Sequence, residues 1–347
     1  MEGTAAMSAM PRLVVAGLSG ESGKTLVSLA LLLEAGRRRL PSRAFKKGPD
    51  YIDAAWLGWA SAHAARNLDT HLMGFDRARQ SFARHAIASG MNVIEGNRGL
   101  FDGLDARGTH STAELAKALQ APVVLVVDAT KVTRTAAALV LGCQKLDPAV
   151  RLAGVIVNQA AGSRHARLVR EAIEVDCGVP VLGIVPRAAP GALLSTRHLG
   201  LVTPQEQAEH ELLANNLMEL VAQHLDFDRL LEIARQAVPL EVPPAPQPSA
   251  PAADGVRIGY LQDSAFNFYY PENLEALTGA GAGLVPISSL TAAALPGDLD
   301  ALYIGGGFPE THAERLSRNT GFLASIRSAA NAGLPVYAEC GGLMLLA

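Results

Sequence analysis

The chain has 347 residues, of which 49% are hydrophobic and 18% charged, a composition typical of a globular protein of about two domains. Its net charge is −3 without a basic stripe, which argues against a nucleic-acid partner. The apolar runs are too short to cross a membrane, and the N-terminus lacks the pattern of a signal peptide. Three widely spaced cysteines (Cys143, Cys177 and Cys340) favour a reducing cytoplasm over a disulfide scaffold or a zinc site.

From Leu13 onward, short apolar runs alternate with longer amphipathic segments. Runs rich in valine and isoleucine predict buried strands at 12–17, 91–96, 122–128 and 152–158. Helical spacing is clearest at 25–39 and 111–120. Buried strands that alternate with helices predict an α/β fold with a parallel sheet covered on both faces. Residues 204–237 also have helical spacing but carry no recognisable motif.

The segment LVVAGLSGESGKT at 13–25 predicts a strand, a glycine-rich turn and a helix that begins near Lys24 and Thr25. Glycine N–H groups can surround phosphate oxygens, and the helix N-terminus adds positive potential. Lys24 would reach the outer phosphates, and the Thr25 hydroxyl would bind Mg²⁺. The first glycine, Gly17, lies one residue earlier than in the common GxxxxGK[ST] pattern. The strand-turn-helix context favours a phosphate-binding loop over a glycine-rich turn without a ligand.

Carboxylates follow in two later segments. Asp50 and Asp53 come directly after a Gly-Pro turn in GPDYID, and Glu95 ends the predicted strand MNVIE. A Mg·ATP site needs such oxygen ligands beyond the hydroxyl of the phosphate loop. Ligands of α/β proteins bind at the carboxyl ends of parallel strands. The alternative is that these are ordinary turns with capping acids.

Six prolines between Val238 and Gly255 predict a semi-rigid linker, since such a stretch cannot hold a helix or an inner strand. A second α/β pattern follows, with predicted strands at 256–262, 282–288, 299–307 and 334–340. The predicted domains are therefore 11–237 and 256–347, joined by the linker 238–255.

Cys340 lies where the last of these strands turns sharply into a helix, in YAECGGLM. A thiol on such an elbow is exposed, and the N–H groups of the helix favour its thiolate. A nucleophilic cysteine also needs a base, usually histidine, from elsewhere in the fold.

The glycine spacing, GPDYID, NLD at 67–69 and EGNRGLFDG together resemble the cobyrinic acid a,c-diamide synthase family, as do VIVNQ, FNFYYPENLEAL, YIGGGFPE and YAECGGLM. The resemblance runs from about Leu13 to the last residue. It implies an ATP-binding P-loop domain similar to dethiobiotin synthetase, followed by an incomplete, flavodoxin-like class I glutamine amidotransferase domain. It also implies ATP and Mg²⁺ as cofactors and a triad mechanism for the second domain.

The resemblance assigns roles in the first domain. The triphosphate would be held by Gly17, Gly20, Gly23, Lys24 and Thr25, and the nucleotide base would be contacted by Asn158. Mg²⁺ would be bound by Thr25, Asp50 and Glu95. The site that binds the tetrapyrrole and the reaction intermediate would be lined by Tyr51, Asp53, Asp69, Arg98 and Asp102. The catalytic groups of this domain would be Lys24, Asp53 and Asp102.

In the second domain, the resemblance makes Cys340 the nucleophile and places the oxyanion hole at the backbone of Gly306 and Gly307. The expected reaction is ATP-dependent amidation of the a and c acetate carboxylates of cobyrinic acid through an acyl phosphate. Glutamine or ammonia supplies the nitrogen, and a homodimer is possible. The resemblance thus predicts a cytoplasmic amide ligase of cobalamin biosynthesis.

Three alternatives remain open. Asn97 and Arg98 stand where the compared enzymes usually carry apolar residues, and Arg98 could pair with a carboxylate of a sirohydrochlorin or sirohaem-type substrate. The second alternative is a P-loop nucleotide switch, which regulates a partner and makes no product. Asp53, Asp102 and Cys340 argue against it, because they suit a reaction. The third is an inactive remnant.

The family continues past the cysteine elbow, and that part carries the triad histidine and its acidic partner. We therefore expect a C-terminally truncated chain whose glutaminase half does not function as it stands. His312 is the one histidine after the linker, and it does not match a triad position. The alternative is a synthetase that uses free ammonia or is completed by a second polypeptide.

Overall fold

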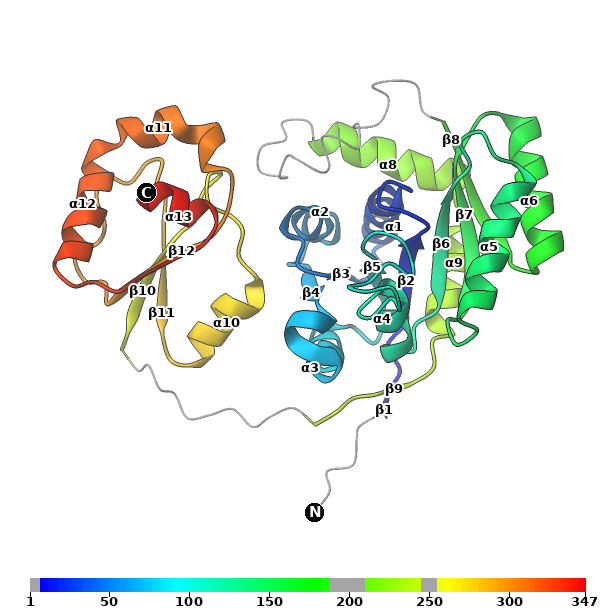
Figure 1. Cartoon of the computed structure of the whole chain (residues 1–347), viewed down its shortest axis with the longest axis horizontal. Coiled ribbons are helices and arrows are strands. Elements are labelled where there is room, and N and C mark those ends of the chain that lie inside the picture. Colours follow the sequence, from blue (N-terminus) through cyan, green and yellow to red (C-terminus); the bar gives the residue numbers. More distant parts are fainter. Residues whose placement is uncertain (1–6, 188–209, 245–254) are drawn as a thin grey trace, which may run out of the picture. The chain divides into compact units, whose positions relative to one another are not determined.

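The computed structural model of the chain describes residues 7–187, 210–244 and 255–347. The chain divides into two compact units, 1–245 and 246–347, which are labelled by element in Figure 1. The family assignment from the sequence predicted this pair of α/β folds, and each unit has a parallel sheet of its own. Of the predicted linker, residues 245–254 lie outside the described ranges.

The sheet of the first unit has seven parallel strands in the order β4-β3-β5-β2-β6-β7-β8. In chain order these are β2 (Arg12–Gly17), β3 (Ser42–Lys47), β4 (Arg66–Leu68), β5 (Met91–Glu95), β6 (Val123–Asp128), β7 (Leu152–Ala160) and β8 (Val181–Pro186). The predicted strands at 12–17, 91–96, 122–128 and 152–158 are confirmed as β2, β5, β6 and β7. β2 lies at the centre of the sheet, with strands on both sides of it. The loop after β2 therefore opens at the point where the strand order reverses, which is where ligands of α/β proteins bind.

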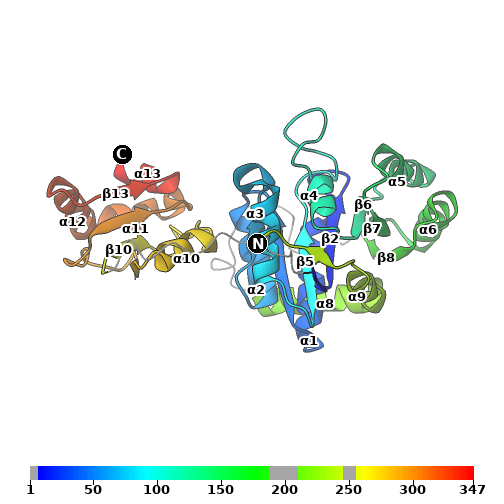
Figure 2. The ribbon, with the colours of Figure 1, turned by 90° about the horizontal axis from the view of Figure 1, so that it is seen from below.

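Helices cover both faces of this sheet. The first face carries α1 (Lys24–Arg37), α2 (Tyr51–Ser61), α8 (His210–His224) and α9 (Phe227–Arg235). The second face carries α3 (Thr70–His85), α4 (Thr112–Ala118), α5 (Arg134–Leu146) and α6 (Ser163–Cys177). Figure 2 shows α1 and α4 on opposite sides of the strands. The helical spacing of residues 204–237 is confirmed for the part that the structure describes, where α8 and α9 form.

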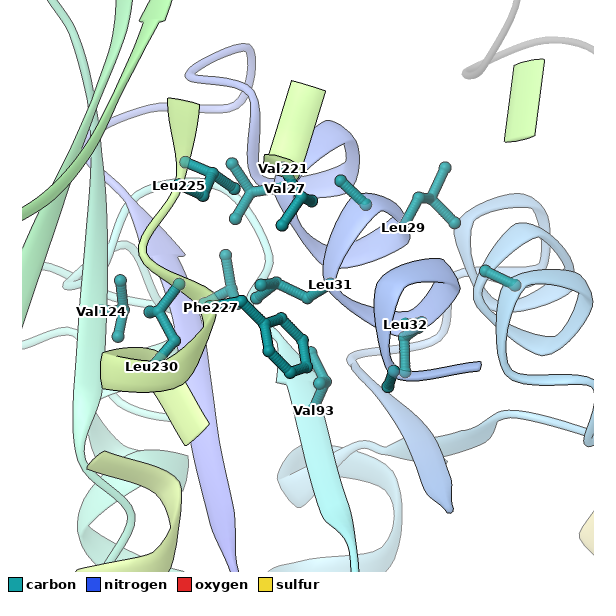
Figure 3. Close-up of a cluster of buried hydrophobic side chains, with 14 of the residues drawn as sticks. Val27, Leu29, Leu31, Leu32, Val93, Val124, Val221, Leu225, Phe227 and Leu230 are labelled. Atoms are coloured by element: carbon teal, nitrogen blue, oxygen red, sulfur yellow. The ribbon is translucent and has the colours of Figure 1, made fainter. Parts of the chain in front are cut away.

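The two faces of β2 belong to different hydrophobic cores. Leu13 and Val15 point into the core under α1, whereas Val14 and Ala16 belong to the core on the opposite face. This alternation follows from the two-residue period of a strand. In the first core, Leu31 of α1 and Phe227 at the start of α9 meet near the sheet, as Figure 3 shows. Full burial of a side chain such as Phe227 contributes about 2–3 kcal/mol.

The first part of the predicted linker packs against the first unit. β9 (Leu240–Glu241) pairs antiparallel with β1 (Met7–Ser8). The buried guanidinium of Arg12 donates to the carbonyl oxygen of Val238 at 2.7 Å and to that of Leu119 at 2.6 Å. Its burial lowers the pKa of Arg12 to about 10. Arg12 thus joins the start of this segment to the first unit, although prolines exclude the segment from an inner strand.

The second unit has four parallel strands in the order β11-β10-β12-β13. They are β10 (Arg257–Leu261), β11 (Gly283–Ile287), β12 (Ala301–Ile304) and β13 (Val336–Ala338), as predicted. The helices are α10 (Pro271–Gly279), α11 (Ala313–Arg318), α12 (Thr320–Asn331) and α13 (Gly341–Leu346), with a short 3₁₀ helix η2 (Pro309–His312). Across both units, the helices of the described ranges include none that is long and apolar enough to span a bilayer.

Candidate active site

The phosphate loop runs from the end of β2 to Lys24, where α1 begins as predicted. Gly23 precedes the helix at φ 99°, and a Cβ on it would lie 2.3 Å from Nδ2 of Asn158. A side chain at this position would therefore be both strained and blocked. Asn158 Nδ2 also donates to the carbonyl oxygen of Ser22 at 3.1 Å. Asn158, the residue predicted to contact the base, thus comes from β7 and packs against the phosphate loop.

The Lys24 side chain is folded into this loop and is only 4% exposed. Its ammonium donates to the carbonyl oxygens of Ser19 at 2.7 Å and Gly20 at 3.0 Å. Burial lowers the pKa of Lys24 to about 8, although Glu95 opposes this shift. The cation is therefore held by the loop's own carbonyl groups at a place where phosphate oxygens could be its acceptors.

A cluster of buried charges lies beside the loop, at the carboxyl ends of β3 and β5. One oxygen of Glu95, Oε1, accepts from the Thr25 hydroxyl at 2.8 Å and from the Lys46 ammonium at 2.7 Å. Lys46 also donates to Oδ2 of Asp53 at 2.5 Å. Lys46 and Glu95 are 1% and 0% exposed, so this ion pair is shielded from water. We call Thr25, Lys46, Asp53 and Glu95 the charge cluster.

Sequence analysis missed Lys46, which is the only cation of the charge cluster. Burial by itself lowers the pKa of Lys46, but Glu95, Asp53 and Asp50 together raise it more, so the group stays protonated. Burial also raises the pKa of Glu95, although Lys46 opposes the shift. A lysine near the end of a strand, two residues before the GPD turn, was the available signal.

The charge cluster fits a divalent cation. The second oxygen of Glu95, Oε2, is buried and has no hydrogen-bond partner among the described residues. An orphaned buried carboxylate oxygen next to a hydroxyl is a suitable hard donor for Mg²⁺. Thr25 and Glu95, two of the three predicted ligands, therefore lie in direct contact.

Several predicted site residues also cap helices. Asp50 caps α2 by accepting from the backbone N–H of Asp53 at 2.8 Å, and Tyr51 is the first residue of that helix. Burial and the neighbouring Asp53 raise the pKa of Asp50. Asp69 caps α3 and accepts from the N–H of His71 at 2.8 Å. The capping alternative is thus realised for Asp50, and its predicted role at the metal remains a prediction.

Arg98 and Asp102 belong to the loop between β5 and α4, residues 96–111, which we call the β5–α4 loop. Arg98 is exposed and has φ 51°, and Oδ2 of the exposed Asp102 accepts from the N–H of Gly99 at 2.8 Å. The N–H of Leu100 donates to the carbonyl oxygen of Gly17 at 2.7 Å. This bond ties the base of the β5–α4 loop to the phosphate loop.

In the second unit, Cys340 forms the predicted elbow between β13 and α13. The thiol residue is exposed, and its backbone has φ 50° and ψ −116°, a conformation that strains a non-glycine residue by about 1–3 kcal/mol. A Cβ on Gly306 would lie 3.4 Å from the Cβ of Cys340, and a Cβ on Gly341 would lie 3.2 Å from the N of Gly307. The two predicted oxyanion glycines therefore lie against the elbow.

Glu339, the residue before Cys340, is held by a hydrogen bond that sequence analysis did not predict. Glu339 Oε1 accepts from the hydroxyl of Tyr303 at 2.8 Å. Tyr303 lies on β12, next to β13, and is 8% exposed. This bond crosses between the strands that carry the glycine turn and the elbow, and it fixes one against the other.

Comparisons with known proteins cover both units. Residues 13–201 match the CobQ/CobB/MinD/ParA nucleotide binding domain, and residues 257–347 match the CobB/CobQ-like glutamine amidotransferase domain. The cobyrinate a,c-diamide synthase of Magnetococcus marinus is 44% identical over 342 residues, which are 97% of this chain and 73% of that protein. The enzymes of that name from Listeria monocytogenes and Archaeoglobus fulgidus are each 43% identical and cover 97% of this chain, with 74% and 73% of their own lengths matched.

Proposed function

Since the chain belongs to the cobyrinate a,c-diamide synthase family, we propose that the charge cluster and the phosphate loop together amidate the a and c acetate groups of cobyrinate. The reaction uses ATP and belongs to cobalamin biosynthesis. The observation that carries this proposal is the contact of Lys46 with both Glu95 and Asp53. Glu95 is bonded to Thr25 of the phosphate loop, while Asp53 is predicted to face the tetrapyrrole.

The chemistry requires activation of a carboxylate. Its negative charge repels nucleophiles, and oxide is a poor leaving group. An oxygen of the substrate carboxylate attacks the γ-phosphorus of ATP, which breaks the bond to ADP and gives an acyl phosphate. Ammonia then attacks the acyl carbon, and phosphate leaves with the former carboxylate oxygen. Both steps need positive charge near the phosphoryl group.

Two lysines of this chain would supply such charge. Lys24 is positioned to bind the outer phosphates from within the phosphate loop. Lys46 lies between the nucleotide side and the predicted substrate side, where the carboxylate and the γ-phosphate repel each other. Its buried ammonium offsets this repulsion more strongly than an exposed lysine would. Mg²⁺, held by Thr25 and Glu95 with Asp50 as a further ligand, would neutralise charge on the β- and γ-phosphates.

The second unit matches a glutamine amidotransferase domain, in which Cys340 would be the nucleophile and a histidine base would have to be supplied before ammonia is released from glutamine. With such a base in place, the Cys340 thiolate would attack the side-chain amide, the protonated base would give its proton to the leaving ammonia, and water activated by the base would cleave the thioester. The N–H groups near Gly306 and Gly307 would stabilise the oxyanion of the tetrahedral intermediate. A homodimer and a cytoplasmic location remain predictions.

The direct experiment incubates the protein with ATP, Mg²⁺, ammonium and either cobyrinate or sirohydrochlorin, and counts the amides by mass spectrometry. We expect two amides on cobyrinate, and none when Lys24→Ala removes the phosphate-binding cation. If only sirohydrochlorin is amidated, then sirohydrochlorin and not cobyrinate is the substrate. ATP turnover that needs a partner protein and forms no amide would instead support the nucleotide switch.

A further inference from the structure

We propose that His110 is a positioning residue, which holds the β5–α4 loop against the first turn of α3 and thereby sets the affinity for the tetrapyrrole. The inference rests on the proposed function, because Asp102 and Asp69 are the acids predicted to face that substrate. Asp102 lies on the β5–α4 loop, and Asp69 caps α3. His110 lies near the end of the loop and contacts residues of α3.

Three contacts join His110 to α3. Its Nδ1 lies 3.0 Å from Oγ1 of Thr70, which is 1% exposed. Its ring stacks on Phe75, with centroids 5.4 Å apart and planes 12° apart. The ring of His71 meets it edge-on, with centroids 5.4 Å apart. A polar contact and two ring contacts therefore hold one side chain of the loop to one helix.

The backbone adopts uncommon conformations on both sides of this contact. His110 itself has φ 58°, in the left-handed region that non-glycine residues rarely occupy. Within α3 the helical conformation is interrupted at Gly74, which has φ 78° and ψ 165°. This kink separates the turn that carries Thr70 and His71 from the turn that begins at Phe75. Residues on both sides of the kink can thus reach the same imidazole ring.

The rest of the loop is bonded mainly to itself and to its base. The N–H of Leu104 donates to the carbonyl oxygen of Thr109 at 2.9 Å, and the N–H of Thr109 donates to Oδ1 of Asp105 at 3.1 Å. The base is tied to the phosphate loop through Leu100. Figure 2 shows this loop in teal beside α4. Such a loop can tilt as a unit unless the end that precedes α4 is also held, and His110 joins that end to α3.

The contacts of His110 should affect the binding of the tetrapyrrole and not the binding of the nucleotide. A rigid polycarboxylate ring that is bound from two sides loses contacts when the two sides separate by even a small distance. The contacts of His110 are with α3, whereas the phosphate loop is formed by other residues. Loss of the His110 contacts should therefore weaken binding of the tetrapyrrole and leave binding of ATP unchanged.

The test compares three variants of the full chain in the ammonium-dependent assay. His110→Ala should raise KM for cobyrinate about tenfold, with kcat and KM for ATP changed less than about twofold. His110→Asn should recover most of the affinity, because asparagine tolerates positive φ and its amide can bond to Thr70. His63→Ala is the matched control, since His63 lies beyond the end of α2, is exposed, and contacts the carbonyl oxygen of Ser61, the last residue of that helix.

Hydrogen exchange of the loop amides at 103–109 provides a readout that does not depend on catalysis. Exchange should be faster in His110→Ala than in the wild type and in His63→Ala. Unchanged exchange, an unchanged KM for cobyrinate, or an equal rise in KM for ATP would each overturn the inference. If the wild type does not amidate cobyrinate, the proposed function fails, while the exchange comparison still decides whether His110 holds the loop.

Discussion

In each unit a parallel strand leads into the helix of the predicted site, and in both the residue before the helix has positive φ. This residue is Gly23 in the first unit, at φ 99°, and Cys340 in the second, at φ 50°. Neither helix has a side-chain cap at this position. No side chain therefore occupies the N-terminus of either helix, although in α13 the N–H of Gly342 donates to the carbonyl oxygen of Glu339 at 2.8 Å.

The two sites differ in what occupies the strained position. At Gly23 a Cβ would collide with Asn158, so the first unit has a glycine and binds with its backbone. At Cys340 the side chain is exposed and is itself the predicted nucleophile, and the strained conformation is occupied by a non-glycine residue. Charged groups near the first site are buried and paired, whereas the thiol of the second faces solvent. Glycine before the helix thus indicates a binding loop, and cysteine indicates a nucleophile.

Removal of the buried cation of the first unit should give the largest effect on stability. Lys46→Met leaves Glu95 and Asp53 without their partner, and we expect the free energy of unfolding to fall by about 3–5 kcal/mol. Chemical denaturation measures the loss. The double variant with Glu95→Gln should recover much of the stability but no amidation. A loss below about 1 kcal/mol would show that the pair is not buried as described.

A methyl group at the strained position of the first unit should disrupt the phosphate loop. Gly23→Ala should lower the free energy of unfolding by about 1–3 kcal/mol and abolish binding of a fluorescent ATP analogue. Gly36→Ala is the control, because a Cβ on Gly36 within α1 has no atom within 4 Å. Alanine there should change stability by no more than about 1 kcal/mol, in the favourable direction. Equal behaviour of both variants would contradict the account.

The affinity for ATP should depend on pH through Lys24. Burial lowers the pKa of Lys24 to about 8, and only the protonated form would bind phosphate as predicted. Affinity should therefore be constant well below pH 8 and fall as pH rises through that value, by about fivefold between pH 8 and 9. Titration with a non-hydrolysable ATP analogue at constant ionic strength measures this. A constant affinity up to pH 9.5 would show that Lys24 stays charged or does not contact the phosphates.

Relief of strain at the second site should give the smallest effect. Cys340→Gly and Cys340→Ala both remove the thiol, but only glycine adopts φ 50° without strain. We expect the glycine variant to be more stable than the alanine variant by about 1 kcal/mol. Thermal unfolding of the two variants side by side measures the difference. Equal stability would show that the elbow is not strained.

Local sequence patterns predicted the features that depend on neighbouring residues. The strands β2, β5, β6 and β7 follow from their apolar runs, and the start of α1 at Lys24 follows from the glycine-rich turn. The elbow at Cys340 follows from an apolar run before a Gly-Gly pair. Each signal lies within a few residues of the feature that it predicts.

The missed features depend on residues that are distant in the sequence. Lysine usually indicates a surface position, and Lys46 is buried because Glu95, 49 residues later, lies beside it across neighbouring strands. His110 contacts Thr70, which is 40 residues earlier, and no local pattern predicts that contact. The bond from Tyr303 to Glu339 spans 36 residues. Only the folded sheet brings these groups together.

We propose that phosphate is transferred to the substrate carboxylate at the charge cluster. The most direct test uses cobyrinate labelled with ¹⁸O in its carboxylates, with ATP and ammonium. We expect the phosphate released for each amide to carry one labelled oxygen. We expect the Lys46→Met variant to form neither labelled phosphate nor amide. Amide formation with unlabelled phosphate would contradict the acyl phosphate route and the role of the charge cluster.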